Sequence, residues 1–553
     1  MDHQEIEWQF EAEELASVED WLGQYYSGSS DLHIAPESTV EITDTYYDTD
    51  DWRFYRAGYT LRVRNTEGEV EATMKSLTPG EGSLRRRREI SEPLEDGKPA
   101  TLRKARGAVG GRSRALVGGR EMRPLFRLET RRQRFALLLG SDANGNQEDS
   151  RIGEISLDAS EIPLGDEQAS LTRVEVEAAI GEAPIPEVHG FVDEMQSALE
   201  LAPAFTSKYE AGLYASGLNP EEDSEFGPTQ VDPSMSLGEV AFAVLRTQFA
   251  EMRDHEPGTR LGDDPEELHD MRVPTRRTRA AMKVFRDALP ERATWLREEL
   301  RWVAHALGDV RDLDVQIERY QAWKEDADEQ SSRLLDKILT ITKKQRAEAR
   351  KNMLEVLDSD RYERLESSFA EMLRRGPAAE LEVAQTDGHE SANQPVTAVA
   401  PDLISGRYRK WRKAAKRLDE TSSPEAFHDV RKKGKRLRYT LEFVSEVYGK
   451  PVRKLVKPLK ALQDDLGDHQ DVVVAAGYLR ELGTTTGGTR VPRGAAFTMG
   501  VYSERCAREA KDLRSVVSDS KPFRTLIKGK KWKKFAKVME SRVEANMPNN
   551  GIR

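Results

Sequence analysis

The sequence predicts an α+β protein with two folded parts, an antiparallel β-sheet or barrel followed by an all-helical half. Three observations favour this division. Polar and apolar residues alternate through most of the first 180 positions, which is typical of half-buried strands. From about residue 236 the apolar residues recur with a helical period, and this half also contains an internal repeat.

Composition limits the kinds of protein that this chain can form. Its 553 residues carry a net charge of −12, and the lone cysteine, Cys506, excludes a disulfide framework and favours a reducing compartment such as the cytoplasm. No apolar run reaches the roughly 18–20 residues of a membrane span, and the first residues lack the pattern of a signal peptide. The charge is divided unequally, because residues 401–553 carry +17 and residues 1–400 carry −29. If the charges of residues 401–553 are ordered, they indicate a surface that binds a polyanion rather than one that only meets solvent.

Alternation places six strands in the first part, at residues 40–49, 59–65, 69–77, 126–139, 151–158 and 171–180. Glycine, asparagine, aspartate and proline residues separate them, as expected for turns. We expect helical insertions at 11–26 and 184–200, and a Gly/Arg-rich loop at 97–124. The acidic stretch 218–235 contains proline, lacks periodicity and is the predicted linker.

The second part, residues 236–545, is predicted to be helical except at a soft segment, 376–401, whose composition indicates disorder or a linker. An internal repeat divides it into halves at about 236–375 and 402–545. Two pairs of segments align without gaps at the same offset of 159 residues, namely 265–279 on 424–438 and 307–315 on 466–474. The helical part is therefore predicted to be a duplicated bundle with pseudo-twofold symmetry.

Each copy of the repeat begins with a helix whose basic side chains recur at steps of three and four residues, so that they form one stripe. Like charges at this spacing repel, so an anion that neutralises the stripe is the better explanation. The alternative is a solvated basic face with a capping histidine, and a metal site is weaker still because arginines stand where further ligands are needed. The stripe contains His269, Arg272, Arg276, Arg279 and Lys283 in the first copy and His428, Arg431, Lys435 and Arg438 in the second, with Arg436 as a further candidate.

These two His-x-x-Arg helices, each followed by a Leu-Gly-Asp-x-x-Asp segment, resemble the CHAD domain, the conserved-histidine α-helical domain. The resemblance covers about residues 236–545. It implies a pair of four-helix bundles that bind inorganic polyphosphate on a central basic surface. Because Lys432 and Lys433 stand where the first copy has Val273 and Pro274, we expect the second half to contribute more of the positive electrostatic potential at this surface.

In the first part, charged residues recur two apart in several predicted strands, as in Glu5 and Glu7 or Arg62 and Arg64. A face that meets solvent is the ordinary explanation for any one strand. The second explanation is a closed barrel with an inward charged face, where both signs of charge require a polyanion and a divalent cation. Such a site could hydrolyse phosphoanhydrides, because carboxylates bind Mg²⁺ or Mn²⁺ and basic groups neutralise phosphate.

The same part resembles the CYTH domain, or triphosphate tunnel metalloenzyme, in segments from EIEWQF near the N-terminus to SKYEAGL at 207–213. The match covers about residues 1–217 and implies a closed antiparallel tunnel of eight strands. By this resemblance the phosphate path would contain Arg62, Arg64, Lys75, Arg88, Arg132, Arg134 and Lys208, and the metal site Glu5, Glu7, Asp158, Glu175 and Glu177. Catalysis would depend on Glu5, Glu7, Lys75 and Lys208.

Two details of this resemblance depend on strand register or on a substitution. Four consecutive arginines leave open whether Arg87 or Arg88 faces inward, and a bulge could bring Arg131 into the place of its neighbours. The family signature Glu-x-Glu-x-Lys ends here in Gln9, which can donate a hydrogen bond but carries no charge. We expect this change to preserve binding and to lower turnover.

The combined expectation is a cytoplasmic protein that hydrolyses inorganic triphosphate or a related triphosphate with Mg²⁺ or Mn²⁺ and binds longer polyphosphate through its helical half. A non-catalytic polyphosphate-binding scaffold is the main alternative. Adenylate cyclase activity ranks lower, because nothing in the sequence indicates recognition of a base. Nucleic acid ranks third, because no aromatic residues are interleaved with the basic stripe.

Overall fold

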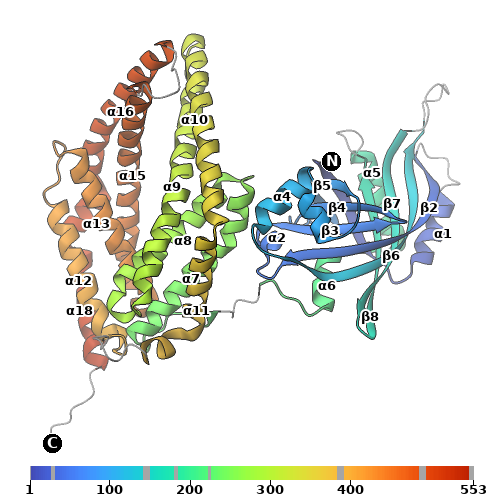
Figure 1. Cartoon of the computed structure of the whole chain (residues 1–553), viewed down its shortest axis with the longest axis horizontal. Helices are drawn as coiled ribbons and strands as arrows, with labels where there is room; N and C mark the ends of the chain where they lie inside the picture. Colours follow the sequence, from blue (N-terminus) through green and yellow to red (C-terminus); the bar gives the residue numbers. More distant parts are fainter. Residues whose placement is uncertain are drawn as a thin grey trace, which may run out of the picture. The chain divides into compact units, whose positions relative to one another are not determined.

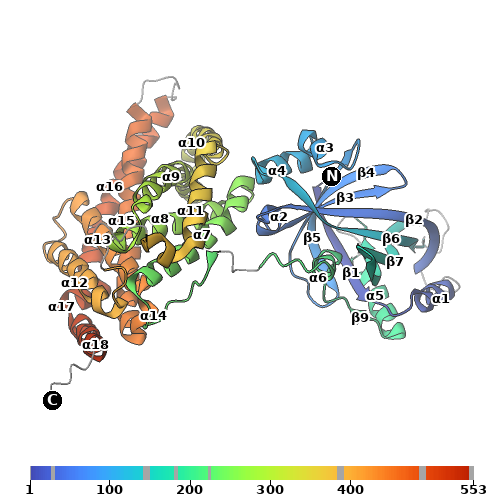
Figure 2. The same ribbon diagram turned by 60° about the horizontal axis from the view of Figure 1, so that its bottom comes forward.

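The computed structural model describes residues 2–25, 32–140, 150–179, 185–221, 226–382, 391–484 and 493–546. The chain divides into two compact units, and each is described by itself (Figures 1 and 2). The first contains residues 1–222 with 257–263, and the second contains residues 223–256 with 264–553. None of the helices described is long and apolar enough to cross a membrane.

Eight strands of the described chain form a closed antiparallel ring in the first unit. Their order is β5-β4-β3-β2-β6-β7-β8-β1, and pairing of β1 with β5 closes the ring, so the predicted barrel is confirmed. A short strand, β9 (Ala202–Pro203), adds to β1 outside the ring. The ring strands are β1 (Asp2–Glu11), β2 (Leu32–Thr49), β3 (Tyr59–Thr66), β4 (Glu69–Ser76), β5 (Leu84–Leu94), β6 (Met122–Leu139), β7 (Ser150–Leu164) and β8 (Glu167–Ala178).

The apolar face of the ring points outward and is covered by helices. Trp8 and Phe10 of β1 pack with Val18 of α1 (Leu15–Tyr25) and Phe191 of α5 (Ile185–Leu199) in one buried cluster. A second cluster joins strands β3 to β5 to two short helices, α3 (Pro99–Lys104) and α4 (Ala108–Val117). Two more short helices complete the unit, α2 (Arg53–Arg56) and α6 (Lys208–Ala215). Because strand side chains alternate between faces, this outward core directs the charged residues of the same strands inward.

The loop predicted at 97–124 is wrong, because α3 and α4 lie within it. Pro99 occupies the first turn of α3, where a missing N–H has no cost, and Leu102, Val109 and Leu116 are fully buried against the barrel. Tertiary burial of these three side chains outweighs the poor helix propensity of the surrounding glycines.

Most of the described residues of the second unit lie in helices, the first of which continues into residues 257–261 of the first unit. Its helices are α7 (Leu237–Leu261), α8 (Pro265–Val284), α9 (Arg292–Glu325), α10 (Glu329–Leu357), α11 (Asp360–Glu382), α12 (Val396–Ala415), α13 (Pro424–Phe443), α14 (Ser445–Tyr448), α15 (Lys450–Thr484), α16 (Arg493–Asp519), α17 (Lys521–Lys528) and α18 (Lys530–Asn546). The soft segment predicted at 376–401 is helical at both ends, and its residues 383–390 lie outside those described. The number of helices in each predicted bundle stays a prediction.

The internal repeat is visible in the helix boundaries. Helices α8 and α13 each contain 20 residues and begin at positions 159 apart, and α7 and α12 begin at the same offset. The Asp264 carboxylate accepts the N–H of Glu266 at 2.9 Å and so caps the start of α8. Ser423 stands at the equivalent position before α13, which begins without a side-chain capping bond.

We expect Trp8→Ala to destabilise the barrel unit by about 3–5 kcal/mol, because this indole is 2% exposed and its removal leaves a cavity between β1 and α5. Phe205→Ala is the matched control, because that ring is 82% exposed and its loss should change stability by less than about 0.5 kcal/mol. Urea unfolding followed by circular dichroism measures both variants. Equal midpoints would show that the outward face of the barrel does not form its core.

Candidate functional site

A charged cavity of about 130 Å³ lies inside the barrel. Among the residues that the structure describes, six cationic and five acidic side chains line it. The cations are Arg62, Arg64, Lys75, Arg87, Arg132 and Lys208, and the acids are Glu5, Glu7, Glu89, Glu175 and Glu177. Nine of these eleven belong to the residues expected from the sequence, so the inward-facing explanation of the charged strand faces is correct for them.

Strand pairing brings these side chains together. In the register of β1, Glu7 lies opposite Glu177 and Gln9 lies opposite Glu175 on β8, while Glu5 lies opposite Arg87 on β5. Residues directly opposite each other in antiparallel strands have Cβ atoms about 4.5–5.5 Å apart. The like-charged pair Glu7 and Glu177 is therefore held close by the backbone, whatever its cost.

The ammonium group of Lys75 is shared by three carboxylates. Its Nζ lies 2.5 Å from an oxygen of Glu5, 3.3 Å from Glu89 and 3.6 Å from Glu7. Burial alone would lower the pKa of Lys75, but Glu7, Glu5 and Glu89 raise it above its usual value. Burial, together with repulsion from the neighbouring carboxylates, outweighs Lys75 and raises the pKa of Glu5 to about 8. One lysine therefore does not neutralise this end of the cavity.

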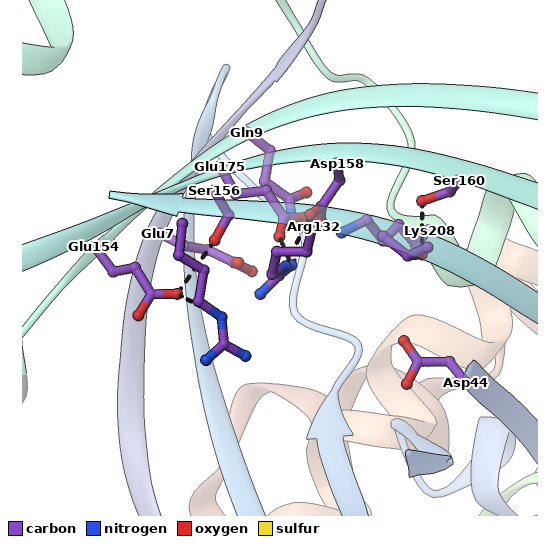
Figure 3. A network of polar contacts seen from close by, with 12 residues as sticks. Glu7, Gln9, Asp44, Arg132, Glu154, Ser156, Asp158, Ser160, Glu175 and Lys208 are labelled. Atoms are coloured by element: carbon purple, nitrogen blue, oxygen red, sulfur yellow. Dashed lines mark hydrogen bonds and ion pairs between the residues drawn. The ribbon is translucent and has the colours of Figure 1, made fainter. Parts of the chain in front are cut away.

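A second group of buried charges joins β6, β7, β8 and α6 (Figure 3). Arg132 donates to Asp158 at 2.8 and 2.6 Å and to Glu175 at 2.7 Å. Lys208 binds Asp158 and lies 2.9 Å from Glu175. Although burial opposes the shift, Asp158 and Glu175 raise the pKa of Arg132. Asp158 is fully buried between these two cations and is not among the residues that line the cavity.

A third group holds the arginines of β3. Arg64 makes a bidentate contact with Asp44 of β2, with both hydrogen bonds at 2.8 Å, and Arg62 lies 3.8 Å from the same carboxylate. Burial opposes ionisation of Asp44, but Arg64 and Arg62 lower its pKa. Asp44 is not among the residues expected from the sequence, and it stands two residues before Tyr46, which lines the cavity.

The structure corrects the expected phosphate path at two positions. Arg88 does not line the cavity and pairs instead with Asp2 at 2.8 Å, while Arg87 faces inward and pairs with Glu7. Arg134 is also absent from the described lining, and its Nε lies 3.8 Å from Glu154. The register of β5 against β1 decides the first case, and no feature of four identical residues could have shown it.

The carboxylates around Lys75, together with Glu177, form the acidic end of the cavity, and their oxygen atoms are suitable ligands for a divalent metal. Burial and the nearby Glu7 and Glu89 raise the pKa of Glu177 to about 7, so an added cation would stabilise the ionised form. Carboxylate oxygens are the ligands that Mg²⁺ and Mn²⁺ prefer. Within the described chain no three acidic, histidine or cysteine side chains stand close enough together to hold a metal ion as they are placed. Lys75 lies between the carboxylates that would have to converge.

Gln9 occupies the wall where the family signature has lysine. Its side chain is 4% exposed, lines the cavity, and donates from Nε2 to Glu175 at 3.2 Å. Glu175 thus has the cations Arg132 and Lys208 and the neutral Gln9 as partners. The local charge that a lysine would supply is missing at this point.

In the helical unit the two basic stripes lie side by side where α8 packs against α13. The Arg276 Nε donates to the hydroxyl of Tyr439 at 3.0 Å across this contact. Burial, followed by Arg276, Arg431 and Arg438, lowers the pKa of Lys435 to about 7. The structure therefore brings the central residues of both predicted stripes into one repulsive group.

The histidines and glycines of the repeat lie around the same arginines. His428 Nδ1 is 2.8 Å from Gln470 Oε1, and burial followed by Arg311 lowers the pKa of His269. A Cβ at Gly467 would lie 3.2 Å from Nη2 of Arg431, and one at Gly308 would lie 3.7 Å from the guanidinium of Arg272. The two glycines thus leave room for equivalent arginines in the two halves.

Arg279 and Lys283 continue the stripe on α8, beyond the central group. Burial, followed by Arg301 and Arg297 of α9, lowers the pKa of Arg279. Lys283 is exposed near the end of α8.

Comparison with known proteins identifies both units. The family model of the CYTH domain matches residues 3–200, and that of the CHAD domain matches residues 243–480. Two uncharacterized proteins from different strains of Mycobacterium tuberculosis are 30% identical over 222 residues, which are 38% of this chain and 39% of each relative. The chain thus aligns with about two fifths of the length of these relatives.

Solved structures are also similar to parts of the chain. The crystal structure of the CHAD domain from the plant Ricinus communis is 26% identical, with a TM-score of 0.43, and the match covers 53% of this chain and 96% of that one. A putative adenylyl cyclase from Hippeastrum, described as revealing a dominant triphosphatase activity, is 15% identical with a TM-score of 0.27, over 39% of this chain and 99% of that one. The family models thus show that this one chain contains an N-terminal CYTH domain and a C-terminal CHAD domain.

Proposed function

We propose that the barrel is a metal-dependent hydrolase of inorganic triphosphate or a related triphosphate, and that the helical unit binds inorganic polyphosphate. One observation carries the first half of the proposal. Among the described residues, the cavity wall carries six cations together with five carboxylates, two of which have pKa values raised to about 7 and 8. A simple anion-binding pocket has no use for the carboxylates, and a simple metal site has no use for the arginines.

The cations supply the binding of the phosphates. Arg62, Arg64 and Arg132 can each present two N–H groups to phosphate oxygens, while Lys75 and Lys208 act as point charges. All five are already paired with carboxylates, so a triphosphate must take over these partners rather than meet free charges. This exchange favours a ligand with several negative charges close together.

Glu5, Glu7, Glu175 and Glu177 are the residues that would hold the divalent cation, and a bound metal would supply an activated water and neutralise developing charge. The chain's own part is to fix these carboxylates on paired strands. A bound cation would favour the ionised forms of Glu5 and Glu177, whose pKa values the protein alone raises. Lys75, beside Glu5 and Glu7, and Lys208, beside Glu175, both line the cavity and would stabilise the charge that develops on the leaving phosphate. Asp158 contacts both Arg132 and Lys208 and so holds these two side chains in position.

Two features favour polyphosphate as the ligand of the helical unit, and a third favours a cytoplasmic location for the protein. The stripes of α8 and α13 join into a single basic group whose mutual repulsion a chain of phosphates would relieve. In the described part of the stripe, Arg276 is bonded to Tyr439, but there is no series of aromatic side chains on which the bases of a nucleic acid could stack. The one cysteine, Cys506, is buried and free, which is consistent with a reducing compartment.

The main alternative is a non-catalytic scaffold that only binds polyphosphate. It is favoured by Gln9, because the neutral side chain leaves Glu175 with one positive partner fewer than the family signature provides. Metal-dependent release of phosphate separates the two functions.

The full-length protein should release phosphate from inorganic triphosphate with Mg²⁺ or Mn²⁺ and not with EDTA. Glu177→Gln should lower the rate by roughly 100-fold or more, because it removes a donor from the acidic end of the cavity. Glu154→Gln is the control, since Glu154 faces Glu177 across β7 and β8 but does not line the cavity. Malachite green detection of phosphate measures the rates. A folded wild-type protein without metal-dependent release would favour the scaffold.

Gln9→Lys should tighten triphosphate binding or raise turnover, by roughly 10-fold, because it adds a charge-assisted contact beside Glu175. Gln9→Met has nearly the same length without the charge and serves as the control. Steady-state kinetics of both variants give kcat and KM. An unchanged rate with lysine would show that Arg132 and Lys208 already satisfy the substrate at this point.

Polyphosphate affinity of the helical unit should fall by roughly 3–10-fold as the pH rises through about 7, because Lys435 loses its proton there and with it one charge of the stripe. Lys435→Arg should flatten this pH dependence, since arginine stays charged and both proteins keep the same histidines. Titration with labelled polyphosphate at constant ionic strength measures it. Identical pH profiles for the two proteins would exclude Lys435 from the binding surface.

A further inference from the structure

The repeat allows the two halves of the helical unit to be compared position by position. The offset of 159 residues holds for the first residues of α7 and α12 and for those of α8 and α13. Arg277 on α8 is equivalent to Arg436 on α13 by this offset. Their surroundings differ in charge.

Arg277 is neutralised by partners on two other helices. Its Nη1 donates to Glu442 Oε2 of α13 at 2.8 Å, and its Nε donates to Gln248 Oε1 of α7 at 2.7 Å. Gln248 in turn donates to Glu251 at 3.1 Å. This arginine therefore acts as a structural brace between α7, α8 and α13.

Around Arg436 each of these partners is replaced by a cation. The offset places Lys283 where the other half has Glu442, Arg407 where it has Gln248, and Lys410 where it has Glu251. Helix α13 packs against both α8 and α12, which carry these residues (Figure 2). The geometry that makes an ion pair on one side of the pseudo-twofold axis thus brings like charges together on the other.

The electrostatics agree with this comparison. Arg436, and then burial, lowers the pKa of Lys283, with further contributions from Arg297, Arg407 and Lys410. Burial and then Arg436 lower the pKa of Arg407. In the part of the chain that the structure describes, no carboxylate lies within ion-pair distance of Lys283, Arg436, Arg407 or Lys410. Lys283, Arg436 and Lys410 are exposed and so accessible to a ligand.

We propose that Arg436, Lys283, Arg407 and Lys410 form an anion-binding site that takes phosphate groups of a polyphosphate chain on one side of the pseudo-twofold axis only. The inference rests on the proposed polyphosphate binding and extends it to α12, outside the His-x-x-Arg helices. Arginine offers paired N–H groups and lysine a compact charge, which together suit successive phosphates. Because Glu442 and Gln248 already hold Arg277, the chain is bound asymmetrically and continues past Lys435 toward α12.

Lys283→Glu in the full-length protein tests this site, because it reproduces around Arg436 the carboxylate that Arg277 has in Glu442. Affinity for long-chain inorganic polyphosphate should fall by about 10-fold or more, and the melting temperature without polyanion at low salt should rise as repulsion becomes attraction. Lys344→Glu is the matched control, since it makes the same charge change at an exposed lysine of α10. Arg407→Gln is a second variant, which should weaken binding without adding a carboxylate.

The outcomes separate this inference from the proposed function. If Lys283→Glu and Lys344→Glu bind polyphosphate equally while the wild type binds it well, the site is overturned and polyphosphate binding stands. A lower melting temperature for Lys283→Glu than for the control at low salt would also overturn it, because the repulsion would then be absent. If the wild type does not bind polyphosphate at all, the proposed function of the helical unit fails with it.

Discussion

The barrel depends on balancing charge inside a closed ring of strands. Removing an ion from water costs several kcal/mol, so each interior charge needs an opposite partner. The structure meets this need by sharing, because Lys75 contacts three carboxylates and Asp44 holds two arginines. Sharing leaves some groups, such as Glu5 and Glu177, less than fully compensated. The interior is therefore stable enough to fold and still able to exchange partners with a ligand that brings charge of its own.

Much of this interior could be predicted from the sequence, because alternation fixes which residues of one strand share a face. The alternation could not show which face Arg88 takes, because in a run of four arginines the inward positions are known only once β1 and β5 are paired. Asp44 was missed because its strand carries polar residues on both faces. Helices α3 and α4 were missed because their glycines weaken the periodic signal, while burial of Leu102 and Leu116 against the barrel decides their structure.

In the helical unit the repeat was evident from the spacing of identical residues, and the boundaries of α8 and α13 agree with it. What the sequence could not show is which positions of the two copies face each other. Lys283 and Glu442 are equivalent residues of opposite charge, yet the difference has physical meaning only once each is placed beside an arginine of the other copy. The two copies thus contain helices of equal length in surroundings of different charge.

Closure of the ring by β1 also affects the order of folding. This strand is synthesised before its partners β5 and β8, which end at Leu94 and Ala178, so its pairing raises the contact order of the domain and must await most of the barrel. Until then an unpaired strand carrying Trp8 and Phe10 is open to edge-to-edge association. Glu5 and Glu7, which alternate with its apolar residues, supply the like-charge repulsion that opposes aggregation of such a strand. The charges that line the cavity of the folded barrel are thus the same charges that oppose edge-to-edge pairing of β1 before the ring closes.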